Sequence, residues 1–372
     1  MKATLHRESF LAAFGQAQAV APTKGPKPAL NYILLDCGAD KAYLHASDTE
    51  QSLRIELTGV EVDAPGKIML PIALVGSVLR ESSDEALKLN VEKTNLRIRG
   101  QSSDYKLATM DPEEFPVFED SKGEGQAAQS SAAGLLTGLK RTVFACDPTS
   151  SRYALGGVLF QFAKNDLNLV ATDGSRLSKY TLQLDESPEK NTEAVVPEKS
   201  VKTLQRLLAG FPDGGVDLLL TANWLRAEVG PYVFRGRLLE GRFPNWKAVI
   251  DGFADDVQVQ FLAGPLHQSI RQAAIALIGS ETSAMDFRID EGQLTLVSKS
   301  ESSTSEVELP LVAAAKDRKL DVSLNHRYVT DALKTFDDEQ QLTFCGHDSA
   351  SAVKIIDGNG FLYVAMPLNT EK

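Results

Sequence analysis

The chain is poor in the residues that mark special structural classes. Only three of its 372 residues are cysteines, Cys37, Cys146 and Cys345, and they are widely separated with no C-x-x-C pair. A disulfide framework, a zinc site and a redox pair are therefore not expected, and we predict neither a metal nor a cofactor. No apolar run is long enough to span a bilayer, and no fibrous or low-complexity bias is present, so we expect ordinary globular domains.

The chain also has fewer basic than acidic residues. It carries 39 Lys and Arg against 50 Asp and Glu, which gives a formal net charge of −11 at pH 7. Phosphate binding usually comes with a basic surplus, so the bulk charge argues against nucleic acid as a partner. That argument fails if the basic residues are segregated on one surface.

Known catalytic motifs are missing as well. The sequence contains no G-x-x-x-x-G-K-[ST], no G-x-G-x-x-G after a strand, no H-E-x-x-H and no G-x-S-x-G. Its five histidines are scattered, and Asp173, which precedes a glycine, is better explained as a cap for the backbone donors of a turn. We therefore predict that the protein is not an enzyme and has no catalytic residues. An enzyme with a Ser/His/Asp site assembled from distant residues is the alternative.

An apolar stretch near the start of the chain, Phe10 to Phe14, superficially resembles that of a secretory leader. Gln16 and Gln18 follow it at once, and Phe10, Leu11 and Phe14 have helical spacing. We therefore expect an amphipathic helix in a cytoplasmic protein, with no membrane as a partner.

Three sequence markers recur at nearly constant spacing along the chain. They are Asp48 and Asp173, 125 residues apart; Pro71, Pro197 and Asn325, at steps of 126 and 128; and Phe115-Pro116 and Phe243-Pro244, 128 residues apart. Their agreement indicates a threefold internal repeat whose unit is long enough to form its own core. The sequence therefore predicts three similar domains in series, at residues 1–121, 130–251 and 252–372.

Each repeat shows the same order of periodic patterns. Helical spacing opens each repeat and returns after the second marker, at residues 72–79, 200–208 and 326–336. Runs that alternate apolar and polar residues, such as 52–57 and 95–99, are typical of antiparallel strands. We predict an α+β fold in which each domain has two helices and about eight strands.

Three segments carry a resemblance to a known family. They are residues 171–177 (ATDGSRL), 241–246 (GRFPNW) and 363–368 (YVAMPL). In this order within a threefold repeat they make the whole chain resemble the bacterial DNA polymerase III beta subunit family, the DNA sliding clamps. The resemblance implies a head-to-tail homodimer closed into a ring, with strands outside and helices around double-stranded DNA of any sequence.

A basic inner surface would reconcile this resemblance with the acidic net charge. Weak phosphate contacts through Lys and Arg suit sliding, because the closed ring and not the affinity supplies the residence time. Some of these cations are implied by the family and others by their place on expected helices. The candidates that face DNA are Lys24, Lys27, Arg80, Lys140, Arg141, Thr149, Arg152, Tyr153, Lys199, Lys202, Arg206 and Arg271.

The resemblance also implies a groove between the second and third domains for short peptides of partner proteins. The expected partners are the DNA polymerase III alpha subunit, the clamp loader, other polymerases and repair factors. Met and Leu suit this task, because they form a pocket that repacks around different peptides. The implied groove residues are Leu155, Thr172, Gly174, Ser175, Arg176, Leu177, Pro244, Val249, Val364, Met366, Pro367 and Leu368.

The chain departs from the family pattern at the rim of this groove. Ser175 stands where a histidine is common, Ala248 where an arginine is usual, and Asn369 where the tail is often basic. We expect the apolar floor to be kept and the polar positions of partner peptides to differ.

For ring closure the resemblance points to Tyr105 and Leu107 of the first domain, which would meet Leu277 and Ile278 of another copy. Simple core packing is the alternative for the last two residues. A second reading of the whole chain is a three-domain peptide-binding scaffold that never encircles DNA, and composition does not separate it from a clamp.

Overall fold

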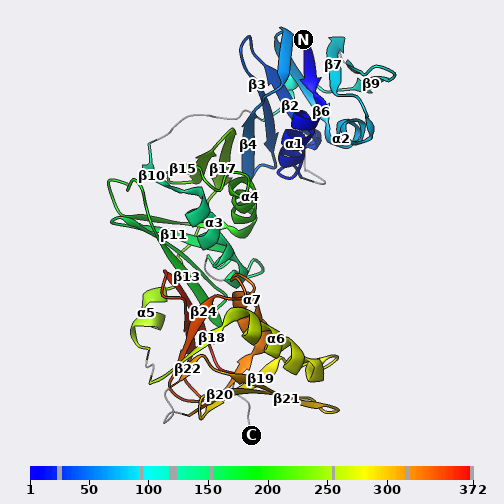
Figure 1. The fold of residues 1–372 in the computed structure, drawn as a ribbon. Helices are drawn as coiled ribbons and strands as arrows, with labels where there is room; N and C mark the ends of the chain where they lie inside the picture. The colour runs from blue at the N-terminus through cyan, green and yellow to red at the C-terminus, as the bar shows by residue number, and fades with distance from the viewer. Residues whose placement is uncertain are drawn as a thin grey trace. The chain divides into compact units, whose positions relative to one another are not determined.

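The computed structural model describes residues 1–22, 27–92, 95–116, 124–150, 154–253, 256–314 and 319–368 (Figure 1). The chain divides into two compact units. Unit 1 comprises Met1–Leu136, Leu184–Lys190 and Lys202–Leu238, and unit 2 comprises Thr137–Gln183, Asn191–Val201 and Leu239–Lys372. Lys24, Arg152, Tyr153 and Asn369 of the predicted sites lie outside the described residues.

The order of elements recurs three times along the described chain: one strand, a helix, four or five strands, a helix and three strands. The first pass consists of β1 (Lys2–His6), α1 (Arg7–Gln18), β2 (Tyr32–Cys37), β3 (Ala42–Ser47), β4 (Gln51–Glu56), β5 (Val60–Ala64), β6 (Gly66–Pro71), α2 (Ile72–Glu81), β7 (Ala86–Glu92), β8 (Asn95–Arg99) and β9 (Asp104–Ala108). This order confirms the predicted α+β repeat.

The second and third passes follow the same order. The second consists of β10 (Gln126–Ser131), α3 (Ala132–Lys140), β11 (Gly157–Ala163), β12 (Asp166–Thr172), β13 (Arg176–Gln183), β14 (Thr192–Pro197), α4 (Glu198–Leu208), β15 (Gly215–Leu220), β16 (Trp224–Val229) and β17 (Tyr232–Arg237). After α5 (Trp246–Asp251), the third consists of β18 (Val257–Leu262), α6 (Ala263–Ala273), β19 (Ala284–Asp290), β20 (Gln293–Lys299), β21 (Thr304–Pro310), β22 (Ala313–Ala314), β23 (Leu320–Asn325), α7 (His326–Leu333), β24 (Gln341–Gly346), β25 (Val353–Ile356) and β26 (Phe361–Ala365).

Short 3₁₀ turns complete the described elements. They are η1 (Pro28–Asn31), η2 (Pro112–Glu114), η3 (Val143–Ala145) and η4 (Ala274–Leu277). None of the helices in the described ranges has the length and apolar composition needed to cross a membrane.

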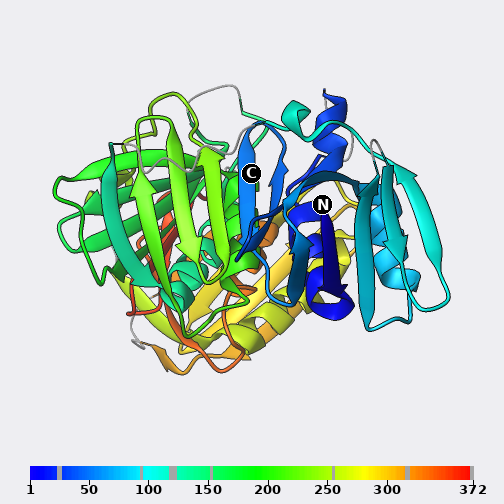
Figure 2. The same ribbon diagram turned by 90° about the horizontal axis from the view of Figure 1, so that it is seen from above.

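Unit 1 contains two antiparallel sheets. The first has the order β5-β1-β7-β8-β9, and the second has the order β10-β15-β16-β17-β4-β3-β2-β6. The second sheet joins two repeats, because β17 pairs with β4, and Figure 2 shows the green strands of the second repeat beside the blue strands of the first. In β3 and β4, buried residues alternate with partly exposed ones, as the period-2 pattern predicts for strands with one face in the core.

Unit 2 repeats this design. A sheet of order β14-β11-β12-β13-β26-β25-β24-β18-β22 joins the second and third repeats through the β13–β26 pair, and a smaller sheet has the order β21-β20-β19-β23. The β13–β26 register places Arg176 opposite Ala365 and Leu177 opposite Val364. Residues 171–177 and 363–368, which are far apart in sequence, are thereby brought side by side (Figure 1).

The helices confirm the sequence predictions, with differences at their ends. α1 buries Phe10, Phe14 and Ala17, which is the expected amphipathic face. The predicted helix 326–336 ends as an α-helix at Leu333. α5 was not expected, because six residues are too few to display a helical period.

Candidate partner-binding site

A tight turn links β12 to β13 and carries four of the predicted groove residues. The Asp173 Oδ1 atom accepts hydrogen bonds from the backbone N–H of Ser175 at 2.9 Å and of Arg176 at 3.0 Å. Thr172 Oγ1 donates to the Arg176 carbonyl at 2.6 Å and accepts from Gly174 N at 3.1 Å. Gly174 has φ of +91°, a left-handed value that glycine adopts without a steric penalty. The sequence therefore dictates this turn locally, and Asp173 has the predicted capping role.

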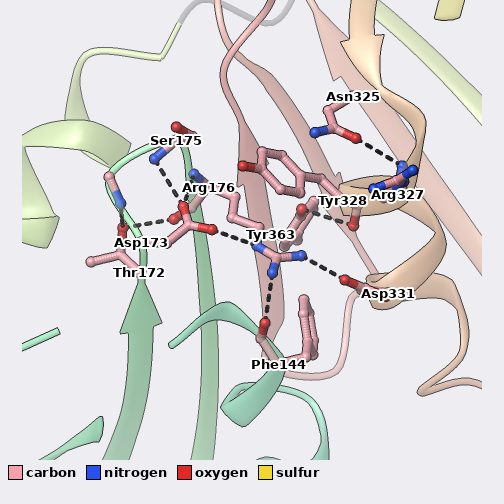
Figure 3. Close-up of polar contacts among 11 residues, drawn as sticks. Phe144, Thr172, Asp173, Ser175, Arg176, Asn325, Arg327, Tyr328, Asp331 and Tyr363 are labelled. Carbon is pink, nitrogen blue, oxygen red and sulfur yellow. Dashed lines mark hydrogen bonds and ion pairs between the residues drawn. The ribbon is translucent and has the colours of Figure 1, made fainter. Parts of the chain in front are cut away.

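Arg176, at the start of β13, ties this turn to two other elements (Figure 3). Its Nε atom lies 2.9 Å from Asp173 Oδ2, its Nη1 atom lies 2.9 Å from Asp331 Oδ2 on α7, and its Nη2 atom donates to the Phe144 carbonyl at 2.8 Å. Only 10% of its side chain is exposed. Burial alone would lower its pKa, but the hydrogen bonds to Asp331 and Asp173 hold the pKa above its ordinary value, so the guanidinium stays charged.

Aromatic side chains pack around the same guanidinium. Its carbon lies 4.4 Å from the ring centre of Tyr328 and 5.6 Å from that of Phe144, distances at which cations are attracted to ring faces. The ring centre of Tyr363 lies 5.8 Å from that of Phe144, and its hydroxyl donates to the Tyr328 carbonyl at 2.9 Å. Burial raises the pKa of Tyr363, so the hydroxyl remains a donor. This arrangement makes Arg176 a structural residue of the site, because each of its three side-chain nitrogens is bonded within the chain.

Sequence reasoning missed Phe144, Tyr328 and Asp331. A signal was present for two of them, because Tyr328 and Asp331 are three residues apart within the predicted helix 326–336 and therefore share a face. Their partner Arg176 is 155 residues from Asp331, a separation that no local pattern reveals.

The predicted apolar floor is largely buried within the chain itself. Leu177 and Val364 belong to one core cluster that also contains Ala154, Leu159, Val170, Val195, Phe243 and Trp246. Leu155 and Thr172 are buried too, whereas Pro244, Pro367 and Leu368 are half-buried. Leu155 and Leu177 therefore pack in the core of the chain itself.

Two of the predicted groove residues are apolar side chains that are exposed. Met366 is 45% exposed and Val249, on α5, is 44% exposed. The backbone N–H of Met366 donates to the Ser175 carbonyl at 2.9 Å, and that of Leu368 donates to the Ser323 carbonyl at 2.8 Å. The end of the described chain is thus held between the 172–176 turn and β23, with the Met366 side chain available for contact.

Most of the described residues predicted to face DNA are exposed. They are Lys27, Arg80, Lys140, Thr149, Lys199, Lys202, Arg206 and Arg271. On α4 the three cations at positions 199, 202 and 206 share one exposed face, while Val201, Leu204 and Leu208 are buried on the other. The Thr149 hydroxyl donates to Asp147 Oδ1 at 2.7 Å, so it belongs to a local turn.

Arg141 differs from its prediction as a DNA-facing residue. Its side chain is only 14% exposed and forms an ion pair with the buried Asp357 carboxylate. The guanidinium carbon also lies 4.2 Å from the ring centre of Phe336 and 5.4 Å from that of Tyr180. The positive charge of Arg141 is therefore paired with Asp357 inside unit 2. We remove Arg141 from the set of residues proposed to face DNA.

The residues predicted for ring closure separate into two kinds. Tyr105 and Leu107 are half-buried on β9, an edge strand of the five-stranded sheet. Ile278 is 80% exposed, but Leu277 is only 7% exposed and packs inside the chain, which corrects its assignment to a surface. Ile275, which sequence reasoning missed, is 64% exposed on the same 3₁₀ turn.

Comparison with known proteins agrees with the fold described above. The family profile described as the DNA polymerase III beta subunit, N-terminal domain, matches residues 1–119, and the one described as its central domain matches residues 132–245. The beta sliding clamp of Escherichia coli (strain K12) is 27% identical over 376 residues, covering 99% of this chain and 100% of the relative.

Other relatives give the same result. The beta sliding clamp of Pseudomonas putida is 26% identical over 375 residues, covering 99% of this chain and 100% of the relative. Among solved structures, the DNA polymerase III subunit beta of Pseudomonas aeruginosa superposes with a TM-score of 0.90 at 25% identity, covering 99% of this chain and 100% of that one. The two family profiles together span well over half of the sequence, and the chain therefore belongs to the DNA polymerase III beta subunit family, the bacterial sliding clamps, which are non-catalytic processivity factors.

Proposed function

We propose that this chain is a DNA sliding clamp. Two copies associate head to tail in a ring around double-stranded DNA, and short peptides of partner proteins dock on the surface formed by Met366, Val249 and the 172–176 turn. The expected partners are the DNA polymerase III alpha subunit, the clamp loader, other polymerases and repair factors. The observation that carries the peptide-binding part is that Met366 and Val249 are exposed apolar side chains on the two segments that supply Val364 and Trp246 to one buried cluster.

The exposed cations support the DNA-binding part of the proposal. Lys and Arg on helices contact phosphate without reading bases, which suits a ring that must slide over any sequence. Because each phosphate contact releases counterions, affinity for DNA should fall steeply with salt, and ring closure then provides the residence time.

The proposed peptide site combines adaptability with a fixed frame. Met366 is unbranched and polarizable, so it repacks around different aromatic or leucine anchors. The 172–176 turn is tied to α7 by the charged hydrogen bonds of Arg176, so we expect it to keep its conformation when a peptide binds. Ser175 and the exposed Ala248 stand where the family often has a histidine and an arginine, so we expect partner peptides to differ in their polar positions.

Ending the chain after Ala365 is expected to weaken peptide binding by roughly a hundredfold, because it removes the Met366 side chain and the bonds to the Ser175 and Ser323 carbonyls. Fluorescence anisotropy of a labelled Gln-Ala-Leu-Ser-Leu-Phe peptide measures the change, and light scattering should show the same oligomer as the intact chain. Met366→Ser should reproduce most of the loss, whereas Val312→Ser, at another exposed aliphatic residue, should have no effect. Unchanged binding by the shortened chain would contradict the site, and loss of the dimer would contradict its separation from the ring interface.

A further inference from the structure

The five methionines of the chain differ in how much of each reaches solvent. Met69 and Met285 are fully buried, and each belongs to a hydrophobic core cluster. Met1 and Met110 are half-buried, whereas Met366 is 45% exposed. Met366 therefore carries the most accessible thioether of the chain, and it lies at the centre of the proposed peptide site.

The backbone around Met366 is held in place although the side chain is exposed. Its N–H donates to the Ser175 carbonyl at 2.9 Å, and the N–H of Leu368 donates to the Ser323 carbonyl at 2.8 Å. The residues before it belong to β26, whose Val364 is buried. None of these contacts involves the thioether. A chemical change at the Met366 sulfur should therefore alter the surface of the site and leave the fold intact.

An accessible thioether is oxidised by peroxides. Hydrogen peroxide transfers one oxygen atom to the sulfur: the O–O bond breaks, an S=O bond forms, the sulfur loses two electrons and the rest of the peroxide leaves as water. Thiol-dependent methionine sulfoxide reductases reverse the change, because two thiols become a disulfide and the oxygen leaves as water. Oxidation thus converts a flexible apolar side chain into a polar one in a reversible manner.

We propose that Met366 is a reversible oxidation site, and that its sulfoxide blocks the peptide site. The inference rests on the proposed peptide-binding function, in which Met366 and Val249 contact the apolar anchor of a partner. An anchor docked against the sulfoxide would bury its polar oxygen, and a buried polar group without a hydrogen-bond partner is costly. Partner peptides are therefore excluded under oxidising conditions and bind again after reduction.

The three cysteines are the competing targets of an oxidant. Cys37 and Cys345 are buried, and burial raises the pKa of the Cys37 thiol to about 11, which keeps it out of the reactive thiolate form. Cys146 is partly exposed and follows the η3 turn that contains Phe144. Oxidation at Cys146 could thus disturb the site from its other side, and the variant Cys146→Ser removes that contribution from the test.

Mass spectrometry of the full-length Cys146→Ser protein during peroxide treatment tests the selectivity. Met366 should be converted to the sulfoxide roughly tenfold faster or more than Met69 and Met285, because oxidation follows exposure. A saturating amount of the Gln-Ala-Leu-Ser-Leu-Phe peptide, which contains no sulfur, should slow the oxidation of Met366 and leave that of Met110 unchanged. Equal rates at Met366 and at the two buried methionines would overturn the proposal, and so would a Met366 rate that saturating peptide does not change.

Anisotropy of the labelled peptide measures the consequence in the same Cys146→Ser background. Oxidation should weaken peptide binding by roughly tenfold or more, and a methionine sulfoxide reductase with its thiol reductant should restore it.

Two further variants assign the effect to one sulfur. Met366→Leu has no thioether at this position, so peroxide should not change the affinity that this variant has, whereas Met110→Leu should lose affinity on oxidation as its parent does. The proposal is overturned if peptide affinity survives complete oxidation of Met366, or if peroxide weakens binding equally in Met366→Leu. Absence of binding before any treatment would instead refute the peptide site itself, and with it the switch.

Discussion

Replacing Arg176 with alanine is expected to lower the free energy of unfolding of unit 2 by about 3 kcal/mol and to weaken peptide binding by roughly tenfold or more. The substitution leaves the Asp173 carboxylate and the Phe144 carbonyl without their charged donor in a largely buried setting. The Asp331 side chain is about one-third exposed, so water compensates part of its loss, which keeps the cost at the low end of the range for a broken buried ion pair. Peptide affinity falls because the 172–176 turn is no longer fixed to α7.

The two tryptophans of the chain allow this change to be assigned to one unit. Trp224 belongs to unit 1 and Trp246 to unit 2, so in a Trp224→Phe background the fluorescence of Trp246 follows urea unfolding of unit 2 alone. The control is Arg288→Ala, which removes an exposed arginine and its exposed ion pairs. It should shift the midpoint of urea unfolding very little. If Arg176→Ala shifted the midpoint of urea unfolding as little as Arg288→Ala does, the structural role of Arg176 would be contradicted.

The repeat itself supplies a rescue variant. The double substitution Arg176→Gln with Asp331→Thr installs the neutral pair that Gln51 and Thr203 form at the equivalent place in unit 1. This pair should recover part of the stability lost in Arg176→Ala, because no uncompensated carboxylate at position 331 remains. Recovery of stability together with peptide affinity would show that the turn needs a connection to α7, and recovery of stability alone would assign the binding loss to the missing charge.

Replacing Ile275 and Ile278 with aspartate is expected to convert the proposed dimer, of twice 40.3 kDa, into a folded monomer of 40.3 kDa. Both side chains are mostly exposed in the single chain, so the charges cost little in folding. In an apolar contact between copies, the loss of two isoleucines removes about 1.5–3 kcal/mol each and adds two carboxylates that must be desolvated. The dissociation constant should rise by roughly a hundredfold or more.

Light scattering after size exclusion measures this change. Val312→Asp is the matched control, since Val312 is also an exposed aliphatic residue and should leave the dimer intact. Leu277→Asp should instead destabilise the folded chain, because it places a charge at a position buried in the core. A dimer mass in the Ile275 and Ile278 variant would remove this turn from the ring interface.

The features that were predictable from the sequence are the ones that local patterns or the repeat determine. The Asp173 turn follows from Thr-Asp-Gly-Ser, and the 125-residue spacing predicts an equivalent turn at Asp48. Helices with apolar periodicity, such as α4, were found, whereas α5 is too short to show one. Local patterns therefore predicted the elements and the turns of the site.

The features that were missed depend on contacts between distant segments. From the sequence alone, Arg141 is indistinguishable from an exposed cation. Its contacts with Asp357 and Phe336 exist only in the folded chain. Leu277 and Ile278 are adjacent in sequence, and only the geometry of the 3₁₀ turn decides which of them is buried. Arg176 was identified as a site residue, but its role as a tie to Asp331 comes from three-dimensional contact alone.

Retention on DNA of closed and open topology tests the central claim most directly. The labelled protein is loaded by a clamp loader onto a nicked circular plasmid, and the amount that co-elutes with DNA is measured before and after a single cut of the plasmid. A ring around the duplex should remain on the circle, even where salt abolishes ordinary phosphate binding, and should be lost after linearisation because it slides off the ends. Equal retention on circular and linear DNA, or no retention on either, would contradict a clamp and favour a peptide-binding scaffold that does not encircle DNA.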